Sequence, residues 1–121
     1  MSKLLTDAEL ELMQLLWRHG PLTARQALEH LPDDRAYTTV ATILRILVEK
    51  GFASSAPQGR AHVFQPTLGR SEYQMRKVRH VVDDLFDGSP LDLVRQLVRR
   101  QALSEDEVAE LKALVDELPD D

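Results

Sequence analysis

The sequence of 121 residues contains no cysteine and few aromatic residues, which make up 5% of the chain. The absence of cysteine excludes disulfides, thiolate chemistry and zinc sites built from thiolates. We expect a core of leucine, valine and isoleucine carried on helices. No run approaches the ~20 apolar residues of a membrane span. The first residues, MSKLLTDAELELM, carry acids where a signal peptide has an unbroken apolar stretch. The sequence therefore predicts a cytoplasmic protein with no direct membrane association.

Catalytic and metal-binding motifs are missing as well. The sequence has no G-x-S-x-G motif, no glycine loop for phosphate and no pair of carboxylates with supporting groups. The histidines show neither i, i+4 spacing nor a short metal-ligand run, and we interpret them as unrelated: His19, His30, His62 and His80. The sequence predicts that the protein is not an enzyme and has no cofactor and no metal site.

Charge is distributed unevenly along the chain, although the net value is −5. Residues 35–70 hold five basic side chains against Glu49 alone, which gives +4. Residues 104–121 hold eight acids against Lys112, which gives −7. A basic middle followed by an acidic end indicates two segments with different roles. The alternative is that both charge runs are simply solvated faces.

Three helices and a hairpin are predicted for the first part of the chain. Threonine followed three residues later by Glu or Gln forms a capping box at a helix start, and the sequence has this pair at Thr6–Glu9 and at Thr23–Gln26. The segment AYTTVATILRILVEKGF, residues 36–52, places Val40, Ile43, Leu44 and Leu47 on one buried stripe. Two extended runs follow, at 52–56 and 62–66, with a turn at 57–60. Three helices followed by a two-stranded wing predict a winged helix-turn-helix domain over residues 1–70.

The outward face of the third helix carries short side chains and one arginine instead of many charges. A helix that enters the major groove of DNA needs such a face, because short side chains let the helix approach the base edges and arginine can bind guanine with two hydrogen bonds. The alternative is a threonine-rich solvated face with a solubilising arginine. The Gly-Arg turn of the hairpin favours the DNA-binding interpretation of this face. The predicted DNA-binding residues are Thr38, Thr39, Ala41, Thr42, Arg45 and Arg60.

Residues 71–121 are predicted to form a helical dimerisation domain. Ser89-Pro90 and the Ser104–Glu107 capping box start two of its helices. A segment this short cannot readily build its own core, and exchange of apolar stripes between two chains would bury them. The alternative is a monomer in which the segment folds back on its own winged helix. The predicted dimerisation residues are Met75, Val78, Val82, Leu85, Leu97, Val108, Leu111, Val115 and Leu118.

The motifs AYTTVATILRILVEKGF and GRAHVFQP, with the tryptophan of the first helix and the DGSP start of the C-terminal helices, closely resemble the penicillinase-repressor (BlaI/MecI/CopY) family. This resemblance implies a homodimeric transcriptional repressor that pairs through its C-terminal helices. Family members bind double-stranded operators with inverted repeats built around TACA and TGTA. In many of them a membrane metallopeptidase receptor triggers cleavage of the repressor. The best-known family outcome is repression of a β-lactamase operon, and other members serve stress loci.

The chain departs from the family pattern at three points. Ile46 stands where family recognition helices usually carry a second arginine. The copper-responsive branch ends in Cys-x-Cys motifs, which a chain without cysteine lacks, so copper sensing of that type is not expected. Gln96-Leu97 occupies the position of the Asn-Phe bond cleaved in staphylococcal members, so no cleavage site is assigned.

The alternative function is a winged helix that binds another protein without sequence-specific DNA binding.

Overall fold

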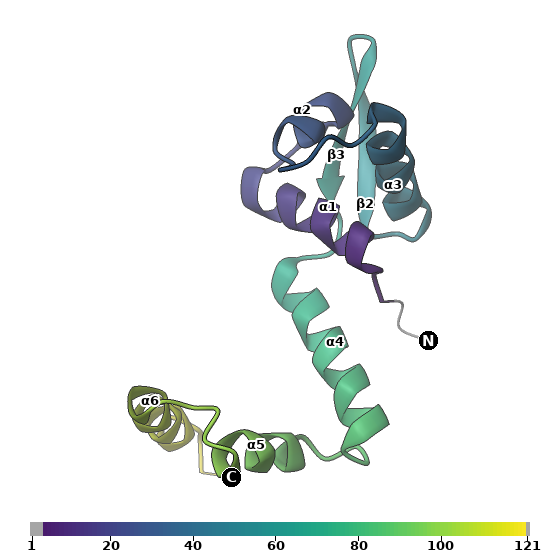
Figure 1. The fold of residues 1–121 in the computed structure, drawn as a ribbon. Coiled ribbons are helices and arrows are strands. Elements are labelled where there is room, and N and C mark those ends of the chain that lie inside the picture. The colour runs from purple at the N-terminus through teal and green to yellow at the C-terminus, as the bar shows by residue number, and fades with distance from the viewer. Residues whose placement is uncertain (1–3, 121) are drawn as a thin grey trace. The chain divides into compact units, whose positions relative to one another are not determined.

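The computed structural model describes residues 4–120 and contains, within them, six helices and a small three-stranded sheet (Figure 1). The elements in chain order are α1 (Asp7–His19), β1 (Leu22–Thr23), α2 (Ala24–Glu29), α3 (Tyr37–Glu49), β2 (Ala53–Gln58), β3 (Ala61–Pro66), α4 (Arg70–Leu85), α5 (Pro90–Arg99) and α6 (Glu105–Asp116). The predicted fold class, a mostly helical protein with an N-terminal winged helix and a C-terminal helical region, is confirmed. None of these helices is long and apolar enough to cross a membrane.

Helix starts follow the predicted caps. All three capping boxes form both of their hydrogen bonds, at Thr6–Glu9, Thr23–Gln26 and Ser104–Glu107. The hydroxyl of Ser89 accepts a hydrogen bond from the N–H of Asp92 at 3.2 Å and caps α5. α3 differs, because its N-cap Ala36 has no side chain that can accept such a bond.

The wing is a β-hairpin whose strands extend further toward the tip than the sequence predicted. β2 and β3 pair antiparallel from Ala53 opposite Pro66 to Gln58 opposite Ala61. Gly59 takes a φ of 62° at the first position of the two-residue loop, as a type II′ turn requires, and Arg60 follows it. A third strand, β1, was not predicted and pairs with the other side of β3. Because β1 runs directly into α2, this pairing fixes the start of α2 to the sheet of the wing.

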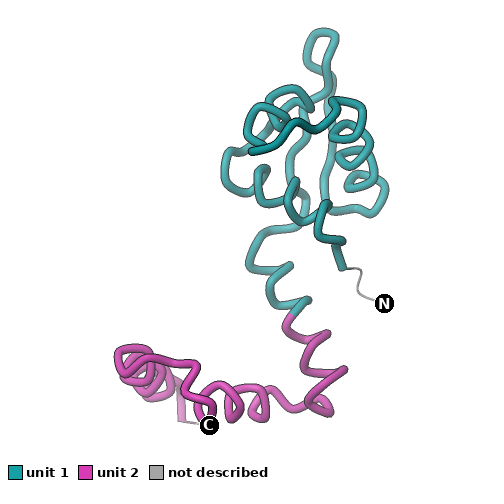
Figure 2. Tube along the Cα trace, in the orientation of Figure 1, with its two compact units in different colours: residues 1–77 teal, residues 78–121 magenta. Residues whose placement is uncertain are grey.

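The first of two compact units comprises residues 1–77 (Figure 2). Its core includes Tyr73, which is 3% exposed and lies edge-on to Phe52 with 6.0 Å between the ring centroids. The Tyr73 hydroxyl accepts a hydrogen bond from the backbone N–H of Leu5 at 2.9 Å. The predicted boundary after residue 70 coincides with the start of α4. The winged-helix unit nevertheless extends further, because its core needs the first turns of that helix.

Two ion-pair clusters tie α1 to the rest of the first unit. Glu9, which is 6% exposed, receives the ammonium group of Lys50 at 2.7 and 2.9 Å. Arg35 forms a two-pronged pair with Glu11 and also contacts Asp33. Two of the five basic residues counted in segment 35–70 therefore hold the fold together.

The second unit, residues 78–121, leaves much of its apolar surface open. Within the described residues, α5 and α6 bury none of their side chains. Val82, a predicted dimerisation residue, is 4% exposed, so it already packs inside its own chain and is not an open surface residue. Val108 and Leu111 are half-buried. The exposed large apolar residues of α4, α5 and α6 are Met75, Val78, Leu85, Leu91, Val94, Leu97, Val98, Leu114, Val115 and, just beyond α6, Leu118.

Candidate nucleic-acid interface

The two faces of α3 are sharply divided between packing and exposure. Val40, Leu44 and Leu47 are completely buried and attach the helix to the core. Thr38 and Arg45 are exposed on the opposite face, because a residue about two or five positions from a buried one points away from it on a helix. Thr42, also exposed, shares this outward face.

Thr39 does not share this face. Together with Ile43 it borders a separate hollow between α1 and α3, which also includes Glu11 and Arg35. One step along a helix rotates a side chain by about 100°, so Thr39 lies on a different side of α3 from Thr38, and its role in base reading stays a prediction. The sequence could not separate Thr39 from Thr38 without knowing which side of the helix faces the wing.

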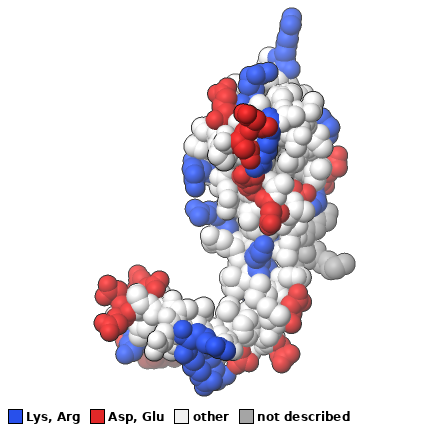
Figure 3. All heavy atoms as spheres, in the orientation of Figure 1, with Lys and Arg blue, Asp and Glu red and all other residues white. Residues whose placement is uncertain are grey.

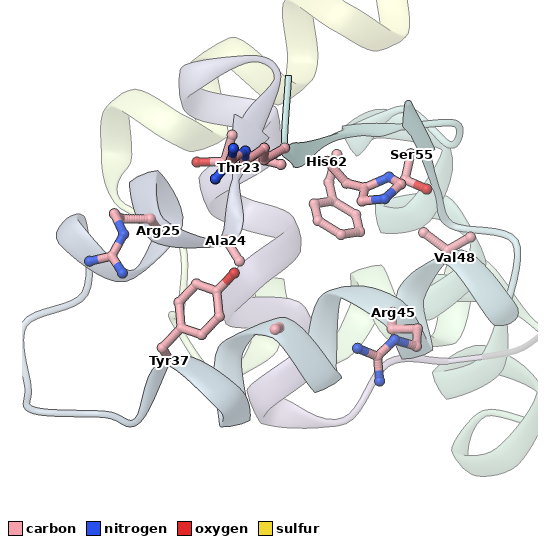
Figure 4. A pocket seen from close by; sticks show the side chains of 12 residues that line it. Thr23, Ala24, Arg25, Tyr37, Arg45, Val48, Ser55 and His62 are labelled. Carbon is pink, nitrogen blue, oxygen red and sulfur yellow. The ribbon is translucent and has the colours of Figure 1, made fainter. Parts of the chain in front are cut away.

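A groove of about 530 Å³ runs between α2, α3 and the wing (Figure 4). It brings together three of the predicted residues: Ala41 and Arg45 from α3, and Arg60 from the turn between β2 and β3. Among the described residues, no acidic side chain lines it. The complete lining is Thr23, Ala24, Arg25, Tyr37, Ala41, Arg45, Val48, Ser55, Arg60, Ala61, His62 and Phe64. In a chain of net charge −5, a groove with three arginines and no acid is suited to an anion.

Sequence reasoning missed two residues of this groove, Arg25 and Tyr37. Arg25 of α2 lies over the ring of Tyr37, with 5.5 Å between the guanidinium carbon and the ring centroid. Figure 4 shows this pair at one end of the groove and Arg45 at the other. No local pattern marks Arg25, because its contact with Tyr37 depends on the angle between α2 and α3.

Three arginines of the first unit line the groove without an acidic partner among the described residues. Of the ion pairs among residues 4–120, none includes Arg25, Arg45 or Arg60. Arg35 is different: its hydrogen bonds to Glu11 and then to Asp33 raise the pKa of the guanidinium further above its ordinary value. Figure 3 shows a basic side chain at the tip of the β2–β3 hairpin, where Arg60 is the only Lys or Arg. The groove and the wing tip thus form one cationic surface of this unit.

The interpretation of the four histidines as unrelated is wrong for two of them. His19, at the end of α1, stacks on His30, at the end of α2, with ring centroids 3.8 Å apart and planes 11° from parallel. The pKa of His19 is lowered mainly by desolvation of the ring, and then by the charges of the nearby His30 and Arg18. Neither ring lines the groove. Spacing rules that consider one helix at a time cannot find a pair formed between two helices.

A three-helix core that presents an exposed helix and a β-hairpin beside one basic groove defines a winged helix-turn-helix protein. More particularly, the chain belongs to the penicillinase repressor family, whose sequence pattern matches residues 5–117. This membership confirms the resemblance stated from the motifs. The relatives found are named as a repressor, as regulatory proteins and as transcriptional regulators.

Individual relatives cover different parts of the chain. It is 26% identical over 115 residues to the penicillinase repressor of Bacillus licheniformis, covering 93% of this chain and 90% of the relative. It is 43% identical over 77 residues to the transcriptional regulator BlaI of Mycobacterium tuberculosis, covering 60% of this chain and 56% of that protein. The solution structure of the monomeric form of Bacillus licheniformis BlaI in complex with the blaP half-operator matches with a TM-score of 0.50 and 29% identity, over 59% of this chain and 89% of the other.

Proposed function

We propose that this protein is a DNA-binding transcriptional repressor that recognises a palindromic operator. The observation that carries the proposal is the groove between α3 and the wing, which has three arginines without acidic partners and no acid in its described lining. Such a surface attracts the phosphate backbone of DNA. The related BlaI of Bacillus licheniformis has been solved in complex with the blaP half-operator, which supports DNA as the ligand.

Base reading falls to the outward face of α3. Thr38, Thr42 and Arg45 are exposed there, and Ala41 borders the groove. Threonine and alanine methyl groups can contact the thymine methyl, and arginine can bind guanine O6 and N7 together. Arg60 extends from the wing tip, where it contacts phosphate without reading sequence.

The test is binding of the full chain to two labelled duplexes of equal length, followed by fluorescence anisotropy at several salt concentrations. One duplex carries an inverted repeat of TACA and TGTA, and the other carries the same bases scrambled. We expect tighter binding to the repeat. Arg60→Ala should weaken both duplexes alike and reduce the salt slope by about one unit. Binding to neither duplex at low salt would contradict the proposal and favour a protein-interaction module.

Dimerisation through the C-terminal helices is the second part of the proposal. Helices whose apolar faces stay open in one chain, as α5 and α6 do, gain most of their burial from a partner. A second copy supplies the same stripes in reverse and forms an isologous two-fold interface. Two-fold symmetry then places two recognition helices about 34 Å apart, or a multiple of that, as a palindrome requires. Sedimentation equilibrium at micromolar concentration tests this, and a single species at 13.7 kDa would contradict it.

Relief of repression by proteolysis is the third part, with a membrane metallopeptidase receptor as the upstream partner of a cytoplasmic repressor. The structural support is α5, a ten-residue helix with no buried side chain. A protease needs an unfolded segment, and a helix that its own chain does not bury opens at low cost whenever the two subunits separate. Cutting α5 would separate the apolar stripes and release DNA. Mass spectrometry of the protein from induced cells tests the model, and an intact chain under full derepression would refute it.

A further inference from the structure

One feature of the groove is not explained by base reading or by the wing. Arg25 is the second residue of α2 and is exposed, yet its guanidinium carbon lies 5.5 Å from the centroid of the Tyr37 ring. Tyr37 is the first residue of α3 and is 47% exposed. An exposed arginine and an exposed tyrosine from two helices are therefore held against each other at the mouth of the groove.

The stability of α2 gives no reason for an arginine at this place. A cation in the first turn of a helix is disfavoured by the helix dipole. Glu29 lies one turn further along the same helix, but no ion pair joins it to Arg25 in the described part of the chain. By contrast, Arg35 and Lys50 are both held by acids of α1.

The contact between Arg25 and Tyr37 leaves the hydrogen-bonding capacity of the arginine free. The attraction between a guanidinium and an aromatic ring uses none of its N–H groups as hydrogen-bond donors to an acceptor atom, and Arg25 donates no side-chain hydrogen bond within residues 4–120. Two of those N–H groups match the spacing of two oxygens of one phosphate. The ring also limits the rotation of a long side chain, so less motion is lost when a ligand binds.

We infer that Arg25 binds a phosphate of the DNA backbone and that Tyr37 is its positioning residue, an inference that rests on the proposed function. The phosphate is favoured over a base because Arg25 belongs to α2, and the first helix of a helix-turn-helix crosses the backbone. Figure 4 shows Arg25 at the end of the groove away from Arg45. The interface thus has a sequence-independent clamp on each side of α3: Arg60 on the wing and Arg25 on α2.

The experiment measures anisotropy of the full-length protein on the repeat and scrambled duplexes against salt. Arg25→Ala should weaken both duplexes equally, on the order of tenfold, and reduce the salt slope by about one unit. Tyr37→Leu should weaken binding while leaving the slope unchanged, because no charge is lost. Tyr37→Phe should bind both duplexes as tightly as the wild type, since the ring and not the hydroxyl holds the arginine. Arg18→Ala is the matched control, because Arg18 lines a different hollow, with Trp17 and Arg70, and its loss should leave the slope unchanged.

A double variant separates positioning from direct contact. In the Arg25→Ala background, Tyr37→Leu should have no further effect, and a further loss would overturn the positioning role. An unchanged slope for Arg25→Ala, with the wild type still binding DNA in a salt-dependent way, would overturn the phosphate contact and leave the proposed function standing. Failure of the wild type to bind either duplex would overturn both.

Discussion

The pair between Glu9 and Lys50 is expected to stabilise the winged-helix unit measurably, and two substitutions at one position separate its parts. Glu9 serves α1 twice: its carboxylate accepts the backbone N–H of Thr6 at 2.9 Å and the ammonium group of Lys50 at 2.7 and 2.9 Å. Glu9→Gln keeps the capping box, because glutamine can also close it, and removes only the charge. Glu9→Ala removes both.

The magnitude follows from the exposure of the two partners. Glu9 is buried, but the Lys50 side chain is 30% exposed and can reach water when its partner is lost. The cost therefore falls below the 3–5 kcal/mol of breaking a fully buried pair. We expect Glu9→Gln to lower the free energy of unfolding by about 1.5 kcal/mol, and Glu9→Ala by roughly 1 kcal/mol more, because the cap is also lost. At about 4–8 °C per kcal/mol, Glu9→Gln should lower the Tm by roughly 6–12 °C.

The dependence on pH provides a second check of the same pair. Burial alone would raise the pKa of Glu9, but the hydrogen bond from Lys50, the backbone N–H of Thr6 and the charge of Lys50 together lower it below the ordinary value of 4.5. The unfolded chain therefore binds the proton more readily. The stabilisation is complete above pH 4.5 and is lost as the pH falls through the lowered pKa.

Urea unfolding followed by far-UV circular dichroism measures these differences in the full chain. Lys50→Met, alone and combined with Glu9→Gln, completes a double-mutant cycle. A coupling energy below about 0.3 kcal/mol at neutral pH would refute the argument, since that is the scatter of independent sites. The argument would also be refuted if the difference in the free energy of unfolding between wild type and Glu9→Gln stayed the same at a pH below the pKa of Glu9.

Further predictions concern the base-reading arginine, the domain boundary and the stacked histidines. Arg45→Ala should cost roughly 1–3 kcal/mol on the repeat duplex and relax the preference at one base pair, which selection from a randomised duplex library measures. A fragment of residues 1–77 should fold cooperatively. A fragment of residues 1–70 should be much less stable, because it lacks the buried Tyr73, and thermal unfolding of the two fragments measures the difference. The lowered pKa of His19 means that folded protein resists its protonation, so stability should fall as the pH drops through 6.5. His19→Gln should flatten this dependence and His62→Gln should not; equal effects would contradict the assignment.

Local signals in the sequence predicted the helices, because caps and apolar periodicity act within a few residues. Thr6, Thr23 and Ser104 all begin helices as predicted. The strand β1 is only two residues long and pairs with a partner about forty residues later, so no periodicity announces it.

The candidate site was predicted where one helix or one turn carries it, and missed where two elements create it. Arg45 and Arg60 were identified from a helix face and a turn, and the structure places both in the groove. Arg25 and Tyr37 meet only because α2 packs beside α3. The basic count of segment 35–70 misled for the same reason, because the acids that hold Lys50 and Arg35 lie on α1.

The division of α3 into a buried face and an outward face has a consequence for evolution. Val40, Leu44 and Leu47 are fully buried, so any change among them is selected for stability. Thr38 and Arg45 form no side-chain hydrogen bond or ion pair within residues 4–120, so substitutions there leave the fold almost untouched. Under the proposed function, duplicated copies of such a gene can therefore diverge in the operators they recognise without first acquiring compensating mutations in the core. The same two positions are the natural starting points for redesigning the specificity of this scaffold.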